Sequence, residues 1–123
     1  MPIVLNHTIV PAQDKEAAAQ FFADIFGLPF EGTRGHFAPV RVNESLTLDF
    51  DNADPVPRQH YAFHVSDGEF EAILGRVKDR GVKFGSGPST QDDGEINNRR
   101  GGRGVYFKDP NGHSYELLTV APS

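Results

Sequence analysis

Two segments of the chain, rich in apolar and β-branched or aromatic residues, are typical of β-strands. They are residues 3–10 and residues 59–66, and the histidines His7 and His60 hold matching places in them, 53 residues apart. Each segment is followed by apolar residues at helical spacing, which predicts an amphipathic helix after each strand. The first helix should begin at Asp14 and end at Gly27, and the second should begin at Asp67 and end at Gly81. The spacing predicts a duplicated module.

Short strands are expected after each helix. In the first half the pattern predicts strands at 29–31, 36–42 and 45–50, and in the second half at 83–84, 104–108 and 114–120. Asp109-Pro110-Asn111-Gly112 is a strong turn signal between the last two strands. Residues 85–104 hold six of the 13 glycines and cannot pack a core, so we expect a long, functional loop there.

The chain has 123 residues and a formal net charge of −5, which fits one domain, with a first module over about 1–54 and a second over about 58–121. This acidic balance argues against nucleic-acid binding, which needs a basic surface. No apolar run is long enough to cross a membrane, and the N-terminus lacks a signal segment, so we expect a cytoplasmic protein. Because cysteine is absent, any metal must be held by His, Asp and Glu.

Three polar residues interrupt the apolar strands: His7, His60 and Glu116. Two histidines and one carboxylate can hold Fe(II) or another divalent ion and leave coordination positions open for substrate. The alternative is that each residue is a hydrogen-bonded core or surface residue, since no short metal-binding motif is present.

Residues 5–10, 60–67 and 104–118 together resemble the vicinal oxygen chelate superfamily, which includes glyoxalase I, bleomycin and fosfomycin resistance proteins and extradiol dioxygenases. The resemblance implies an α+β fold of two βαβββ modules, whose curved mixed sheets form a metal-centred pocket, usually in a homodimer. By motif position, His7, His60 and Glu116 look like the metal ligands of that family. The ion would be Fe, Mn, Ni or Zn, and the sequence does not choose among them.

Departures from known members limit what the resemblance says about substrate. Glyoxalase I commonly has a fourth ligand, a Glu, on the last strand of its first half, and the turn alignment places Thr47 there, with Asp49 on the same strand face. Fosfomycin resistance proteins hold potassium with an acidic, hydroxyl-rich loop, whereas residues 99–103 here read Arg-Arg-Gly-Gly-Arg.

These features predict a divalent-metal enzyme of the glyoxalase and dioxygenase type that chelates vicinal oxygens of a small molecule; lyase, isomerase and dioxygenase reactions all stay open. The alternative is a non-catalytic protein that sequesters an antibiotic, as bleomycin-binding proteins do. We expect proton-transfer roles for Glu116 and His64, and solvent exposure of His113 in the closing turn. Substrate-binding roles are expected for Thr8, Thr47, Tyr106, Asn98, Arg99 and Arg100.

Overall fold

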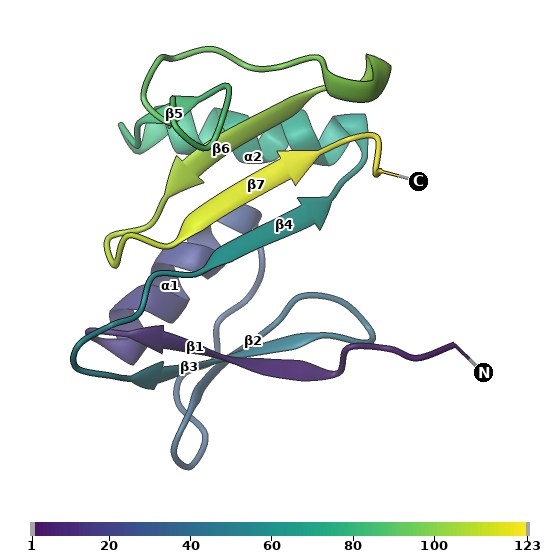
Figure 1. Cartoon of the computed structure of the whole chain (residues 1–123). Coiled ribbons are helices and arrows are strands. Elements are labelled where there is room, and N and C mark those ends of the chain that lie inside the picture. Colours follow the sequence, from purple (N-terminus) through teal and green to yellow (C-terminus); the bar gives the residue numbers. More distant parts are fainter. Residues whose placement is uncertain (1, 123) are drawn as a thin grey trace. The chain divides into compact units, whose positions relative to one another are not determined.

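The computed structural model describes residues 2–122, and the chain divides into two compact units, residues 1–57 and 58–123. Both units are α+β, and each combines a sheet of parallel and antiparallel pairs with one long helix (Figure 1). The predicted fold class is confirmed. No helix within residues 2–122 is long and apolar enough to span a membrane.

The first unit is a three-stranded sheet covered by one helix. Strand β1 (His7–Ala12) runs parallel to β3 (Thr47–Asn52), and β2 (Ala38–Arg41) runs antiparallel to β3 on its other side. Helix α1 (Lys15–Phe26) buries Phe22 and Ile25 against the sheet face that carries Val10, Leu48 and Phe50. The opposite face carries the more polar positions of the same strands.

The caps of α1 are those that the sequence predicts. The Asp14 side chain accepts a hydrogen bond from the backbone N–H of Ala17 at 3.2 Å, and Gly27 ends the helix in the left-handed conformation at φ 71°.

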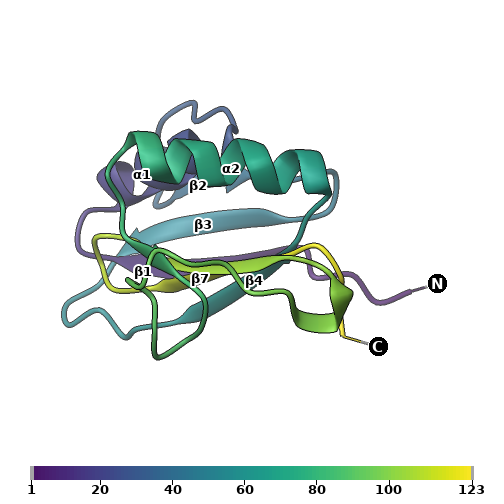
Figure 2. The same ribbon diagram turned by 90° about the horizontal axis from the view of Figure 1, so that it is seen from above.

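The second unit has a four-stranded sheet in the order β4-β7-β6-β5, with α2 along one face (Figures 1 and 2). Its strands are β4 (His60–His64), β5 (Phe84–Gly85), β6 (Gly104–Lys108) and β7 (Ser114–Leu118). Strand β4 is parallel to β7, and β6 is antiparallel to it. Helix α2 (Asp67–Asp79) buries Phe70, Ile73, Leu74 and Val77, while the sheet contributes Tyr115, Leu117, Val105 and Phe107 to the core.

Besides shifts of a few residues in the ends of other strands, some predicted elements differ in the structure. Residues 29–31 form no strand, because Pro29 lacks a backbone donor and Gly32 turns the chain at φ 91°. Strand β1 begins at His7 and not at residue 3. The second helix is capped by Ser66, whose hydroxyl accepts from the Glu69 N–H at 3.1 Å while the Glu69 carboxylate accepts from the Ser66 N–H at 2.8 Å. Because these two hydrogen bonds form a capping box, the N-cap is Ser66, and Asp67, which was predicted as the cap, is the first residue of the helix.

The glycine-rich segment between β5 and β6 is tied to the sheet at several points. Gly85 lets the backbone of Thr90 approach so closely that a Cβ would lie 1.7 Å from the Thr90 carbonyl oxygen. Asn97 pairs with Gly104 through two backbone hydrogen bonds, both of 2.9 Å. Residues Arg99–Gly101 form a short 3-10 turn, labelled η1, in which Arg100 has a positive φ of 57°. The residues on both sides of η1 are therefore held to the sheet by these contacts.

Candidate functional site

His60 and Glu116 meet on neighbouring parallel strands of the second unit. His60 is paired with Ser114 across β4 and β7, so Glu116, two residues further along β7, is its diagonal neighbour on the same sheet face. The His60 Nε2 and Glu116 Oε1 atoms are 3.0 Å apart. Half of the His60 side chain is exposed, whereas 14% of the Glu116 side chain is exposed. The pair lies on the open face, opposite the face that carries the buried Tyr115.

This pair fits two ligands of one divalent ion. Neutral imidazole and carboxylate are ligands of Fe, Mn, Ni and Zn. Two ligand atoms about 2.1 Å from one ion, whose bonds to the ion make a right angle, are about 3.0 Å apart. Within residues 2–122, neither unit brings three His, Asp or Glu side chains into a group that could hold a metal. The second unit therefore offers two ligands of a potential metal site by itself.

A pocket of about 430 Å³ opens beside the carboxylate, and we call it the Glu116 pocket. Its polar lining comes from β4, β6, β7 and η1. Its apolar lining comes from β4, β7 and residues near the C-terminus. Its members are Ala62, His64, Arg99, Arg100, Tyr106, Glu116, Leu118, Ala121 and Pro122. The volume is in the range of small-molecule sites.

Tyr106 and Arg99 form a bonded pair in this pocket. The Arg99 Nη1 atom donates to the Tyr106 hydroxyl oxygen at 2.7 Å, and the guanidinium also lies over the Tyr106 ring, 5.5 Å from its centroid. The His60 and Tyr106 rings meet edge to face, with 5.9 Å between their centroids. Burial raises the pKa of the Tyr106 hydroxyl and the Glu116 carboxylate adds to this rise, while Arg99 opposes it. Tyr106 is thus a neutral phenol that can donate a proton or a hydrogen bond.

His64 lies two positions beyond Ala62 on the open face of β4, at another side of the same pocket. Its Nε2 atom is 3.1 Å from the backbone carbonyl oxygen of Thr119. An imidazole nitrogen at this distance from a carbonyl oxygen must carry the proton, so Nε2 donates to Thr119. The bond fixes the ring against the segment that follows β7.

The other expected site residues are dispersed. Thr47 lines a separate hollow of about 270 Å³ in the first unit, with Arg34 and Arg41. Thr8 pairs with Leu48 and shares the strand face of Val10, which is buried against α1. Asn98 is exposed, and its side-chain amide donates to the Gly102 carbonyl at 3.4 Å; it does not line the Glu116 pocket.

The strand registers show which residues of the two units correspond. His7 is paired with Thr47 as His60 is paired with Ser114, so Thr47 corresponds to Ser114. Asp49, two residues further along β3, therefore corresponds to Glu116. The position in the first unit that matches Glu116 thus holds a carboxylate. His7 itself is exposed on β1, and its Nδ1 atom is 2.8 Å from the Asn6 side-chain oxygen.

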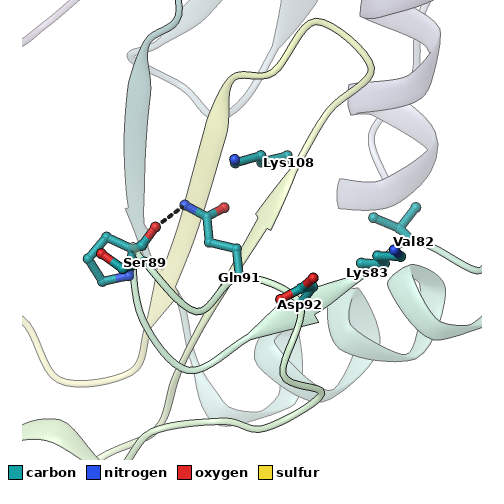
Figure 3. A pocket seen from close by; sticks show the side chains of 7 residues that line it. Val82, Lys83, Ser89, Gln91, Asp92 and Lys108 are labelled. Atoms are coloured by element: carbon teal, nitrogen blue, oxygen red, sulfur yellow. Dashed lines mark hydrogen bonds between the residues drawn. The ribbon is translucent and has the colours of Figure 1, made fainter.

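A larger hollow of about 470 Å³ lies beside β5 and the end of β6 (Figure 3). Lys83 and Lys108 lie apart from each other along its wall, and Gln91 and Asp92 also line it (Figure 3). None of the predicted site residues lines this hollow. The charged groups do not converge on one point, which distinguishes it from the Glu116 pocket.

Comparison with known proteins agrees with the fold. The model of the Glyoxalase/Bleomycin resistance protein/Dioxygenase superfamily matches residues 4–117. The chain belongs to this superfamily.

Two solved structures are similar over nearly the whole chain, and both are titled oxidases. Oxidase ChaP-H2 is 45% identical with a TM-score of 0.92, covering 98% of this chain and 96% of its own. Oxidase ChaP-H1 is 48% identical with a TM-score of 0.91, covering 98% of each chain. Among curated proteins, the glutathione transferase FosA of Serratia marcescens is 28% identical over 120 residues, which are 92% of this chain and 78% of FosA.

We predict that removing Arg99 raises the pKa of Tyr106 further. The arginine stabilises the phenolate by charge and by its hydrogen bond, so Arg99→Leu should leave the phenol protonated to higher pH. NMR titration of protein labelled with ¹³C-tyrosine measures the change. Arg100→Leu is the matched control, because Arg100 lines the same pocket without bonding to Tyr106 in the described contacts. A Tyr106 pKa that is unchanged in Arg99→Leu contradicts the assigned pair.

Proposed function

We propose that the protein is a divalent-metal-dependent oxidase that acts on a small oxygen-bearing molecule through bidentate chelation of two adjacent oxygens. The observation that carries this proposal is the His60–Glu116 pair, whose atoms are 3.0 Å apart beside a pocket with a phenol and two guanidinium groups. The similarity of 45–48% to two proteins titled oxidases supports the oxidative reaction over isomerisation or elimination.

The metal ligands in this proposal are His7, His60 and Glu116. His60 and Glu116 come from the second unit, and His7 is the matching strand residue of the first unit. A bound divalent ion would act as a Lewis acid toward the chelated oxygens and, if redox-active, would also supply electron transfer. Two neutral imidazoles and one carboxylate leave the site with a net charge of about +1, which favours an anionic or enolate-like oxygen.

The surrounding side chains have distinct roles in the proposal. Arg99 and Arg100 attract an anionic substrate oxygen, and Arg99 also keeps the Tyr106 hydroxyl directed into the pocket. Tyr106 donates a hydrogen bond to a substrate oxygen on which charge develops. Glu116 and His64 are the groups that move protons, since both line the same pocket. Arg100, held at a positive φ, places the tip of η1 beside this pocket.

A second candidate is a ligand-binding resistance protein without turnover. The resemblance of the sequence motifs to bleomycin resistance proteins supports this candidate. The chain is also similar, at 26% identity over 122 residues, to the metallothiol transferase FosB of Lysinibacillus sphaericus (strain C3-41). The match covers 94% of this chain and 81% of FosB. Against a pure binder stands the His60–Glu116 pair, because sequestration of a drug does not require metal ligands.

We predict that chelator-free protein binds one divalent ion per chain and that Glu116→Ala and His60→Ala each weaken this binding at least about 100-fold, since each removes a direct ligand. Titration calorimetry with Mn(II), Ni(II) or Zn(II) measures the affinity. His36→Ala is the matched control, because His36 is an exposed histidine bonded to Asp51 in the first unit. Asp49→Ala decides whether the shell has three or four protein ligands. Parental affinity in Glu116→Ala would exclude the assignment.

The oxidase activity is tested with a panel of catechols, hydroxyquinones and 1,2-diketones. We expect metal-dependent oxygen uptake, measured with an oxygen electrode, that falls at least about 100-fold in Glu116→Ala and about 10-fold in Tyr106→Phe. The control is the protein after chelator treatment and again after metal is restored. Tight binding of a panel member without oxygen uptake or product, whether metal is present or not, would favour the sequestering protein.

A homodimer is also part of the proposal. Ile3, Val4, Leu5 and Ile9 are large apolar residues near the N-terminus, and each is more than half exposed. Contact with a second copy would remove this apolar surface from water. Sedimentation at micromolar concentration should therefore give twice the chain mass of 13.5 kDa, and Ile9→Lys should shift it toward the monomer. A parent protein that sediments only as a 13.5 kDa species contradicts the dimer.

A further inference from the structure

The turn between β6 and β7 contains a histidine that is completely buried. We expected His113 to be exposed in a turn, but its exposed fraction is 0%. Asp109, at the other end of the turn, is 6% exposed. Two buried polar side chains in a five-residue turn require hydrogen-bond partners, and these partners show what the turn holds.

The turn is closed by the Asp109 carboxylate. Its Oδ1 atom accepts the backbone N–H of His113 at 2.8 Å and that of Asn111 at 3.0 Å, and its Oδ2 atom accepts the Tyr115 hydroxyl at 3.3 Å. The Asp109 N–H donates in turn to the His113 carbonyl at 3.1 Å. The His113 ring meets Tyr61 edge-on at 5.9 Å, and Tyr61 is stacked on Tyr115 at the same distance. The His113 ring is therefore held in one orientation.

In this orientation His113 binds a residue that is 54 positions away in the sequence. Its Nδ1 atom accepts the backbone N–H of Gln59 at 3.0 Å. The Gln59 carbonyl accepts the backbone N–H of Ser114 at 2.9 Å. The two backbone polar groups of Gln59 are thus bonded to two consecutive residues, His113 at the end of the turn and Ser114 at the start of β7. Nδ1 must lack a proton to accept, so the imidazole is the neutral tautomer that carries its proton on Nε2.

His60 follows Gln59 directly and is the first residue of β4. Its side chain is half exposed, so packing alone does not fix the direction of the ring. The direction therefore depends on where the backbone of His60 lies. A strand that loosened at this end would move the His60 ring away from Glu116, which lies diagonally across β7. The hydrogen bonds of Gln59 prevent this movement. The same turn precedes Glu116 by three residues, so it fixes the start of both strands of the pair.

We propose that His113 is a positioning residue that sets the place of the His60 imidazole relative to Glu116 by holding the Gln59 N–H. The role in metal binding rests on the proposed function, whereas the hold on β4 does not. His113 touches neither metal nor substrate in this role. It acts through one backbone hydrogen bond, which an apolar ring cannot replace and another acceptor can.

The test compares two replacements of His113. His113→Phe keeps the ring volume and removes the acceptor, and His113→Asn presents an oxygen near the place of Nδ1. Val77→Ala is the control for general destabilisation, because Val77 is a fully buried core residue on α2. Calorimetry with Zn(II) measures affinity, and circular dichroism during heating measures folding. We expect affinity to fall about 10- to 100-fold in His113→Phe, to recover in His113→Asn and to stay at the parental value in Val77→Ala.

Hydrogen exchange in the metal-free protein tests the hold on β4 by itself. In His113→Phe the Gln59 and His60 amides should exchange at least about 10-fold faster, while amides of α2 keep their rates relative to one another. His113→Leu serves in the same way if the Phe variant does not fold. Unchanged Gln59 exchange in the variant that lacks the acceptor overturns the proposal, as does a Val77→Ala protein that loses as much affinity as His113→Phe. Loss of metal binding by the parent would instead overturn the proposed function alone.

Discussion

The parallel pairing of β4 with β7 is the constraint on which the candidate site depends. This pairing places a histidine at the start of one strand diagonally opposite a carboxylate on the next, with 3.0 Å between Nε2 and Oε1. The two strands are far apart in the sequence, so the pair exists only when the long connection through α2, β5 and β6 has folded. The first unit repeats the pattern with β1 and β3, where His7 and Asp49 occupy the matching positions. The duplication therefore includes the histidine and the carboxylate as well as the order of the strands.

Around this pair the pocket is electrostatically mixed. Arg99 holds the Tyr106 hydroxyl at 2.7 Å, and burial keeps this phenol protonated, which makes it a donor at neutral pH. The guanidinium groups come from the short turn η1, which reaches the pocket from a glycine-rich segment anchored by Asn97 on Gly104. A rigid sheet thus supplies the His–Glu pair, and an irregular segment supplies the cations. Such a division lets the segment that carries Arg99 and Arg100 vary while the sheet keeps its geometry.

The sequence predicted the caps of α1, the apolar faces of both helices and the closing turn, because these features depend on near neighbours. Asp14, Gly27 and the turn after Asp109 all act within a few residues of themselves. Features that depend on distant pairing were missed. The turn alignment chose Thr47 as the position of a further ligand in the first unit, whereas the strand registers show that Asp49 is the residue that matches Glu116. The same limit applies to His113, whose burial follows from a bond to Gln59 that no local pattern reveals.

The measurement that tests the central claim most directly is anomalous X-ray diffraction from crystals grown with Mn(II) or Co(II) in chelator-free buffer. The account predicts one strong anomalous peak per chain, bonded to Nε2 of His60 and to a carboxylate oxygen of Glu116. It also predicts that the direct 3.0 Å contact between these two atoms becomes a contact through the ion. A peak that is bonded to neither His60 nor Glu116 would contradict the account. So would a His60–Glu116 pair that keeps its direct hydrogen bond, with no ion beside it, at saturating metal.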